Sequence, residues 1–179
     1  SYVWRGTKFG TGPAFQPSIE FSAGGFAIGA WGSYCTSSEE AAEADLYASY
    51  GFDLGENSSL SFTVTDYYFP GTEWADGTSH GFEPMVSLAL GDLSLTGAYM
   101  TGLKENGISD VYFEVGYTAG PVSLTLGAGD GQYSAMAVDP GKAGDFAVCN
   151  IGIGTSKEIK ITDNFSLPVT GAAILNPSS

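Results

Sequence analysis

The chain has 179 residues, of which 26 are glycine and 13% are aromatic, and its 20 acidic and 6 basic residues give a formal net charge of −14. This balance argues against a nucleic-acid partner, because no basic stripe is available to neutralise phosphates. It also argues against electrostatic docking on an anionic membrane surface. The apolar runs are shorter than the roughly 18 residues of a transmembrane helix, so no such helix is expected.

Alternation of apolar and polar side chains recurs along nearly the whole chain, and this period of two predicts β-strands. No convincing helical period is found, so an all-β protein of about eleven strands in one domain, residues 1–179, is expected. In chain order the predicted strands span residues 2–9, 15–22, 25–34, 45–54, 59–69, 81–90, 93–100, 111–117, 122–128, 146–154 and 167–175.

The links between these segments alternate in length. Tight, glycine-rich turns are predicted at residues 22–25, 54–58, 90–93 and 119–121. Longer links are predicted at residues 35–44, 70–80, 101–110 and 131–145. This alternation gathers the short turns at one end of the sheet, and only the link 155–164 is too long for its class.

Tight turns at one end, long loops at the other and alternation throughout are typical of an antiparallel up-and-down transmembrane β-barrel. Bacterial barrels have an even number of strands, so about 12 are expected, with a closing strand after Ser179. The segment 45–54 has the roughly 9–11 residues that a tilted strand needs to cross a bilayer. A soluble β-sandwich remains the alternative, since its strands alternate in the same way.

In a barrel the two parities of each strand face lipid and lumen. The residues expected to face lipid are Leu46, Tyr50, Phe52, Val111 and Phe113. The residues expected to line the lumen are Tyr47, Ser49 and Tyr112. Tyr67, Tyr68 and Phe69 are expected to form an interfacial aromatic girdle, with a sugar-stacking platform as the alternative.

Arg5 is the only arginine and lies in the middle of the first predicted strand. A buried charge has to be paired or solvated, so Arg5 is expected to point into the lumen and to pair with one or more of Glu20, Glu83 and Glu114. Such a network is either a structural latch across the lumen or a charged constriction that selects solutes. The excess of interior acids predicts a preference for cations.

No catalytic, cofactor or metal site is predicted. The sole histidine, His80, lies at a junction between loop and strand without a nucleophile elbow, so a surface or rim position is expected. Cys149 alternates with Ile151 and Ile153 and is expected to be a small strand residue rather than half of a disulfide with Cys35. The acidic run 39–45 lacks a calcium-loop pattern and is expected to be solvated, or bridged to lipopolysaccharide phosphates through calcium.

Several short motifs resemble the TorF-like porins, outer-membrane proteins of Gram-negative bacteria. They are Ser1-Tyr2-Val3-Trp4-Arg5-Gly6, Gln16-Pro17-Ser18-Ile19, Asp66-Tyr67-Tyr68, Val111-Tyr112-Phe113-Glu114 and Ile161-Thr162-Asp163. The resemblance implies a porin-like barrel in the outer membrane and no catalytic residues.

The expected function is therefore passive diffusion of small solutes or ions through a narrow, acidic lumen in the bacterial outer membrane. The expected partners are outer-membrane lipid, lipopolysaccharide and small solutes. Two alternatives stay open: a plugged, structural barrel that is a subunit of a larger envelope assembly, and a secreted β-sandwich that binds carbohydrate.

Overall fold

The computed structural model describes residues 2–36, 42–102, 109–135 and 144–178. These residues are almost entirely in strands, as alternation predicts. The strands are β1 Tyr2–Trp4, β2 Thr7–Phe9, β3 Ala14–Phe15, β4 Ser18–Ala23, β5 Phe26–Cys35, β6 Glu43–Gly55, β7 Ser58–Tyr68, β8 His80–Leu90, β9 Leu93–Gly102, β10 Ser109–Ala119, β11 Val122–Gly131, β12 Gly144–Thr162 and β13 Phe165–Leu175.

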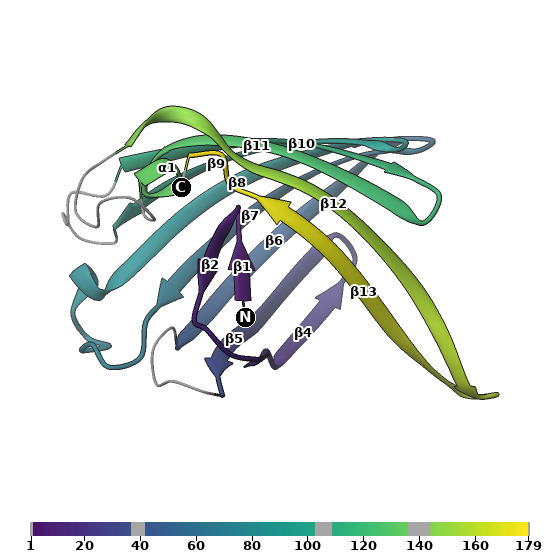
Figure 1. Ribbon diagram of the computed structural model, residues 1–179, viewed down its shortest axis with the longest axis horizontal. Coiled ribbons are helices and arrows are strands. Elements are labelled where there is room, and N and C mark those ends of the chain that lie inside the picture. Colours follow the sequence, from purple (N-terminus) through teal and green to yellow (C-terminus); the bar gives the residue numbers. More distant parts are fainter. Residues whose placement is uncertain (1, 37–41, 103–108, 136–143, 179) are drawn as a thin grey trace.

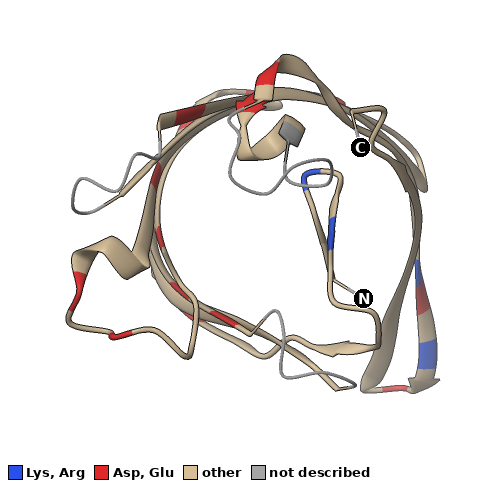
Figure 2. Ribbon diagram, turned by 60° about the vertical axis from the view of Figure 1, so that its left-hand side comes forward, with Lys and Arg blue, Asp and Glu red and all other residues tan. Residues whose placement is uncertain are grey.

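Strands β3 to β13 form one antiparallel sheet of 11 strands, in which each strand from β5 onward pairs with the next one along the chain. Viewed along its axis, this sheet curves into a nearly complete ring (Figure 2). Within the described residues no second sheet packs on its apolar face, and β1–β2 is a separate hairpin. The predicted all-β, up-and-down arrangement is thus confirmed, and the topology differs from that of a sandwich.

The ring is not closed. Its edge strands are β13 and the pair β3–β4, and they are not hydrogen-bonded to each other. Strands β3 and β4 keep one register on β5, from Phe15↔Tyr34 to Ser18↔Trp31, so they form one edge strand that is interrupted at Pro17. Proline lacks an N–H donor and is tolerated at a sheet edge.

The alternation of short and long links is confirmed. Short turns join β4 to β5, β6 to β7, β8 to β9 and β10 to β11, and they share one end of the sheet. The prediction of a long link at residues 155–164 is wrong, because β12 runs on to Thr162 and a two-residue turn leads to β13. Beyond Thr155 the strand β12 pairs only with β13, and this ribbon projects past the turn end of the sheet (Figure 1).

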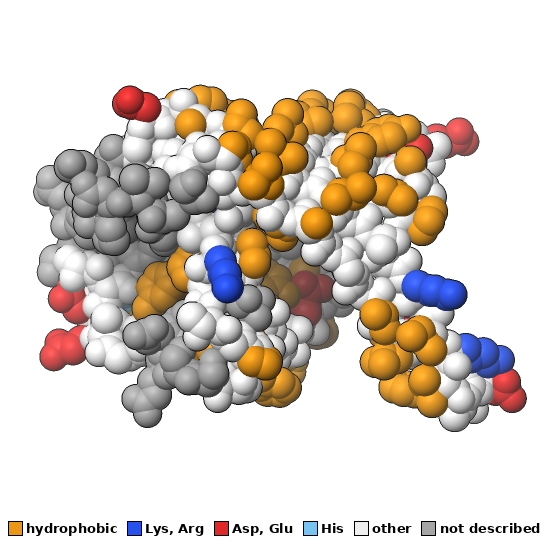
Figure 3. Space-filling view, in the orientation of Figure 1, with side chains coloured by type: hydrophobic (Ala, Val, Ile, Leu, Met, Phe, Trp, Pro, Cys, Tyr) orange, Lys and Arg blue, Asp and Glu red, His pale blue; other side chains and the backbone are white. Residues whose placement is uncertain are grey.

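The two parities of the sheet have opposite character. The outward parity is apolar and exposed, and its side chains cover the visible outer face over β10 to β13 (Figure 3). Leu46 is 49% exposed, Tyr50 48% and Phe52 45%. The inward parity holds Ser, Thr, Gly and acids, and the buried residues Glu83 and Tyr112 belong to it.

The N-terminal segment is not a strand of the wall, which corrects the prediction for residues 2–9. Strands β1 and β2 form a hairpin in the register Tyr2↔Phe9 and Trp4↔Thr7, and this hairpin stands inside the ring (Figure 2). Arg5 and Gly6 make its two-residue turn with φ of 48° and 86°. Positive φ at both central residues is the geometry of tight hairpin turns.

The tip of the hairpin rests on a bulge in β12. The pairing of β11 with β12 steps from Gly127↔Asn150 to Ala128↔Val148, so Cys149 is the extra residue. A Cβ atom on Gly6 would overlap the carbonyl oxygen of Cys149. The bulge turns Cys149 inward, where it is a free and fully buried thiol, so it does not continue the outward row of Ile151 and Ile153 as alternation predicts.

Two short helical segments lie in the links at the end opposite the short turns. The 3₁₀ helix η1, Gly77–Ser79, precedes β8, and the helix α1, Gln132–Ala135, follows β11 and points into the ring (Figure 2). None of the helices formed by described residues is long and apolar enough to cross a membrane.

Replacement of Gly6 by alanine tests the contact between hairpin and wall. We expect Gly6→Ala to lower the free energy of unfolding by about 1–3 kcal/mol from backbone strain alone, with a further loss from the clash with β12. Gly24→Ala is the matched control, because Gly24 also has positive φ (60°) but a Cβ atom added to it would have nothing within 4 Å. Urea unfolding followed by tryptophan fluorescence measures both. Equal losses would contradict close packing at Gly6.

Candidate functional site

Inside the ring, an ion pair joins the hairpin to the wall. The Arg5 guanidinium donates through Nη1 and Nη2 to both oxygens of Glu83 on β8, with Nη2 2.9 Å from Oε1. Glu83 is 1% exposed and also accepts hydrogen bonds from the hydroxyls of Tyr67 (3.2 Å) and Tyr133 (3.0 Å). A two-pronged pair with its remaining acceptor sites filled is the arrangement that makes a buried charge tolerable.

Aromatic rings enclose the same guanidinium. Its carbon lies 4.7 Å from the ring centre of Trp4, 4.4 Å from that of Tyr112 and 5.2 Å from that of Tyr133, each within cation–π range. Burial lowers the pKa of Arg5, but the hydrogen bonds and charge of Glu83 outweigh burial and raise it above the ordinary value. Burial is the main reason that the pKa of Tyr133 is raised, so its hydroxyl stays a donor.

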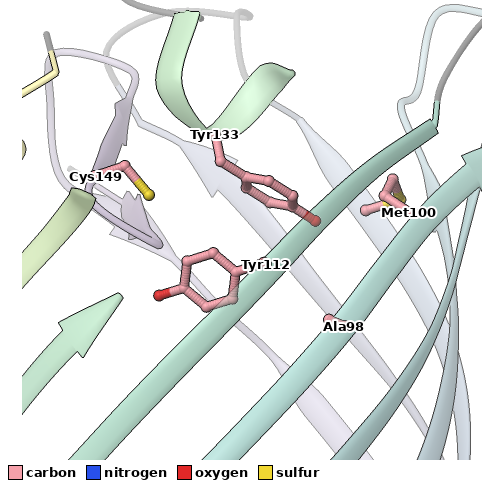
Figure 4. Close-up of a cluster of buried hydrophobic side chains, with 5 residues drawn as sticks. All are labelled: Ala98, Met100, Tyr112, Tyr133 and Cys149. Carbon is pink, nitrogen blue, oxygen red and sulfur yellow. The ribbon is translucent and has the colours of Figure 1, made fainter. Parts of the chain in front are cut away.

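A small packed core surrounds this pair. The buried hydrophobic residues are Ala98, Met100, Tyr112, Tyr133 and Cys149, and Figure 4 shows the rings of Tyr112 and Tyr133 lying close together. Tyr112 lies flat on β11, where a Cβ atom at Gly127 would overlap its hydroxyl. Glycine on the inner face of β11 therefore makes room for the large rings.

The other two acids proposed as partners of Arg5 bind elsewhere. Glu114 accepts hydrogen bonds from Tyr112 (2.5 Å) and from Asn150 on β12 (3.2 Å). Glu20 is exposed on the edge strand β4 and accepts a hydrogen bond from Tyr47 (2.7 Å). The structure thus brings together Arg5 and Glu83 and leaves Glu20 and Glu114 outside the pair.

The remaining predicted wall residues divide by parity. Tyr47, Ser49 and Tyr112 lie on the inward parity, with Tyr112 buried and the other two half-buried. Phe113 lies on the outward parity and is 56% exposed, whereas its outward neighbour Val111 is half-buried. Residues of the inward parity are therefore either packed or solvated, depending on whether the hairpin covers them.

The predicted aromatic girdle is not one continuous group. Tyr67 points inward and packs edge-on against Trp4 with ring centres 5.7 Å apart. Tyr68 belongs to the other parity and stacks on His80 at 5.3 Å, while Phe69, just after β7, is 44% exposed. Adjacent strand residues face opposite sides, so Tyr67 and Tyr68 cannot share a belt.

His80 is at the rim, as expected, but it is buried at 5% exposure. Its Nδ1 lies 2.8 Å from the carboxylate of Asp66 and its Nε2 lies 2.9 Å from the carbonyl oxygen of Trp74. Both ring nitrogens face acceptors, so the geometry favours an imidazolium that donates twice. The ring is a structural clamp on the loop, because neither nitrogen is left to activate a nucleophile.

A cavity of about 130 Å³ lies between the hairpin, the wall and α1, near the ends of the long links. Its lining residues are Trp4, Phe9, Glu43, Tyr67, Phe69, Thr78, Ser79, His80, Gly81, Met100 and Gln132. The lining is mostly apolar and aromatic, with a few polar groups, which is the composition of ligand sites.

Two carboxyl groups are buried beside this cavity. Glu43 and Asp45 share the inward face of β6 and are 5% and 7% exposed. This corrects the expectation that the acidic run ends in a solvated loop, while Glu39 and Glu40 lie outside the described residues. No three or more His, Cys, Asp and Glu side chains in the described part of the chain are placed to hold a metal ion.

Alternation alone missed Trp4, Tyr133 and Gly6 as parts of the site. Tyr133 lies in a long link, where no period applies, and an Arg-Gly turn lacks the Asn-Gly or Asp-Gly signal of a tight hairpin. The shortness of the segment before Gly10 is a signal that could have indicated a hairpin, since each arm of three residues is too short to cross a bilayer.

Removal of Arg5 tests the ion pair. We expect Arg5→Met to lower the free energy of unfolding by about 3–5 kcal/mol, because Glu83 is left buried without its counter-charge. The double variant Arg5→Met/Glu83→Gln is expected to recover most of that loss. Lys160→Met is the control, since its pair with Asp163 is solvent-exposed and contributes little. Urea unfolding measures all three, and a double variant as unstable as Arg5→Met would contradict a buried pair.

Comparison with known proteins identifies a family. A family model named Gcw_chp and described as a bacterial protein of unknown function matches residues 1–158. No curated protein and no solved structure matches the chain. Because the match covers most of the chain, this protein belongs to the Gcw_chp family of bacterial proteins.

Proposed function

We propose that the chain is the wall of a β-barrel in the bacterial outer membrane and that small solutes or ions diffuse passively through its narrow, acidic lumen. The observation that carries the proposal is the direction of the apolar face. Large apolar side chains on the outward parity are exposed. On β4 and β5 alone, the exposed fraction runs from 41% for Phe26 to 75% for Ile19. An apolar surface of this extent is unfavourable in water, whereas the hydrocarbon chains of a lipid bilayer would cover it.

The inner face supports the same proposal. Outside the small core around Arg5, the described inward positions are mostly polar residues or glycine, and they form hydrogen-bonded pairs such as Ser87 with Thr96 (3.0 Å) and Tyr47 with Glu20 (2.7 Å). A strand with apolar residues outside and polar residues inside is inverted relative to a soluble barrel. The resemblance of the sequence to the TorF-like porins agrees with this arrangement.

Membrane insertion requires the unpaired edges at β4 and β13 to be covered, because unpaired backbone groups cost several kcal/mol each in hydrocarbon. Strands β3 and β4 count as one edge strand. Together with the nine strands β5 to β13, they give the sheet an even number of strands. In an even, antiparallel meander the first and last strands run in opposite directions and can pair directly. The hairpin takes no position in the wall.

A plugged, structural barrel is the second candidate, and one observation favours it. The hairpin and α1 both lie inside the ring (Figure 2), and Arg5, Trp4 and Tyr133 contact the inner wall at Glu83 and Tyr67. A hairpin that never moves would block solutes at this level and leave the protein with an architectural role in an envelope assembly.

Paired lysine substitutions on β7 test the membrane location. Phe62 faces outward and is 47% exposed, whereas its neighbour Ser61 faces the lumen. We expect Phe62→Lys to cost about 2–4 kcal/mol of folding free energy in lipid, and Ser61→Lys to cost much less. Folding into phosphatidylcholine vesicles, with urea unfolding in the vesicles, measures both. Equal tolerance, or folding without lipid or detergent, would contradict the proposal.

Planar-bilayer recording tests conduction. We expect the intact protein to give a small, cation-preferring conductance, and deletion of residues 2–9 to raise it severalfold because the hairpin narrows the lumen. The reversal potential in a potassium chloride gradient measures the preference. Silence of both proteins would favour the structural candidate, and equal conductance would show that the hairpin is no constriction.

A further inference from the structure

We propose that the cavity between the hairpin, the wall and α1 binds a small organic cation of the alkylammonium class. Trp4 and Phe9 of the hairpin line it, together with Tyr67 at the end of β7 and Phe69 just after that strand. His80 also lines it, but both of its ring nitrogens are already bound, to Asp66 and to the carbonyl oxygen of Trp74. Aromatic faces attract cations through their quadrupoles, and cages of such rings recognise quaternary ammonium groups.

Charge in the cavity favours a cation over a neutral guest. Glu43 lines the cavity, and the carboxyl of Asp45 is close enough to share a hydrogen bond with it. Among the described residues no hydrogen bond or ion pair joins a basic side chain to either acid, since Arg5 is bound to Glu83. The hydrogen bond between the two carboxyl groups requires one of them to be protonated, so the pair carries at most one negative charge. A cation in the cavity would balance that charge, which has no basic partner among the described residues.

Two buried polar atoms near this place have no hydrogen-bond partner among the residues that the structure describes. They are Oδ1 of Asp45, whose residue is 7% exposed, and Nε2 of Gln132, whose side chain lines the cavity. Buried polar atoms are almost always satisfied, so each orphan indicates a missing partner. The open amide donor of Gln132 suits a guest that carries an oxygen acceptor beside its cationic head. Asp45 does not line the cavity and adds only the hydrogen bond that it shares with Glu43.

The size of the cavity limits the guest. Its volume of about 130 Å³ is near the roughly 150 Å³ of a cavity that takes up benzene. A trimethylammonium head with a short hydroxyl or carbonyl arm fits this size, whereas a sugar or a peptide does not. The class is therefore a small ammonium compound.

This inference goes beyond the proposed barrel function and does not depend on it. The residues that form the cavity come from the hairpin, the strands β6 to β9, the link between β7 and β8, and α1, and they keep their places whether or not the lumen conducts. Binding can fail while conductance is observed, and the reverse also holds, so the two results are distinguishable.

Calorimetric titration of the folded, detergent-solubilised full chain with choline tests the site. The control ligand is 3,3-dimethyl-1-butanol, which has the same shape and no charge, and sodium chloride controls for ionic strength. We expect saturable choline binding and at least tenfold weaker binding of the alcohol. Equal binding of the two would overturn the choice of a cation, and binding of neither would overturn the site.

Matched carboxylate variants locate the binding. Glu43→Gln is expected to weaken choline binding at least tenfold and to leave the weak binding of the alcohol unchanged. Glu20→Gln is the control, because Glu20 is an inward acid that does not line the cavity, and it is expected to bind choline as the parent does. Unchanged affinity in Glu43→Gln would overturn the proposal. If Glu43→Gln fails to fold by circular dichroism, the comparison of choline with the alcohol on the parent protein decides.

Discussion

The interior of this protein depends on how one buried positive charge is held. The side chain of Arg5 is 10% exposed and lies among three aromatic rings. These rings attract the guanidinium through their π faces but carry no negative charge. Glu83 supplies the counter-charge, and Tyr67 and Tyr133 fill the acceptor sites that remain. Breaking a buried pair costs far more than an exposed pair contributes. The position of Glu83 on the wall therefore determines where the hairpin lies.

The position of the hairpin explains the shape of the inner face of the wall. The small residues of β11 are needed because Tyr112 and Tyr133 lie against them, and the bulge at Cys149 is needed because the hairpin tip touches β12. The cavity beside Glu43 has the hairpin as one of its walls. The side chains of the inner face are therefore chosen to fit the hairpin that packs on them, whereas the outer face needs only an apolar residue at each outward position.

Much of the fold could be predicted from alternation, because a period of two is a local property. The strands that contain Leu46, Tyr50 and Phe113 were predicted with the correct face exposed, and the order of short and long links followed from glycine-rich turns. The hairpin could not be predicted in this way, since its arms alternate like wall strands and only contacts distant in sequence show that it folds inward. Counting it as a wall strand made the predicted number of strands in the wall odd.

The site was partly predictable for the same reason. A lone arginine among acids indicates a buried pair, but only three-dimensional packing selects Glu83 over Glu20 and Glu114. Tyr67 shows the converse limit: an aromatic cluster in sequence divides between two faces of a strand, so composition alone cannot assign its members to one belt.

The contacts of the hairpin also bear on the order of folding. Arg5 is 78 residues from Glu83 and 128 residues from Tyr133 along the chain, whereas most pairings in the sheet join neighbouring strands. Contacts between distant residues form late, because the loop entropy must be lost before they contribute. The segment that is first in the sequence is thus among the last to reach its place, and it docks into a wall whose strands have already paired.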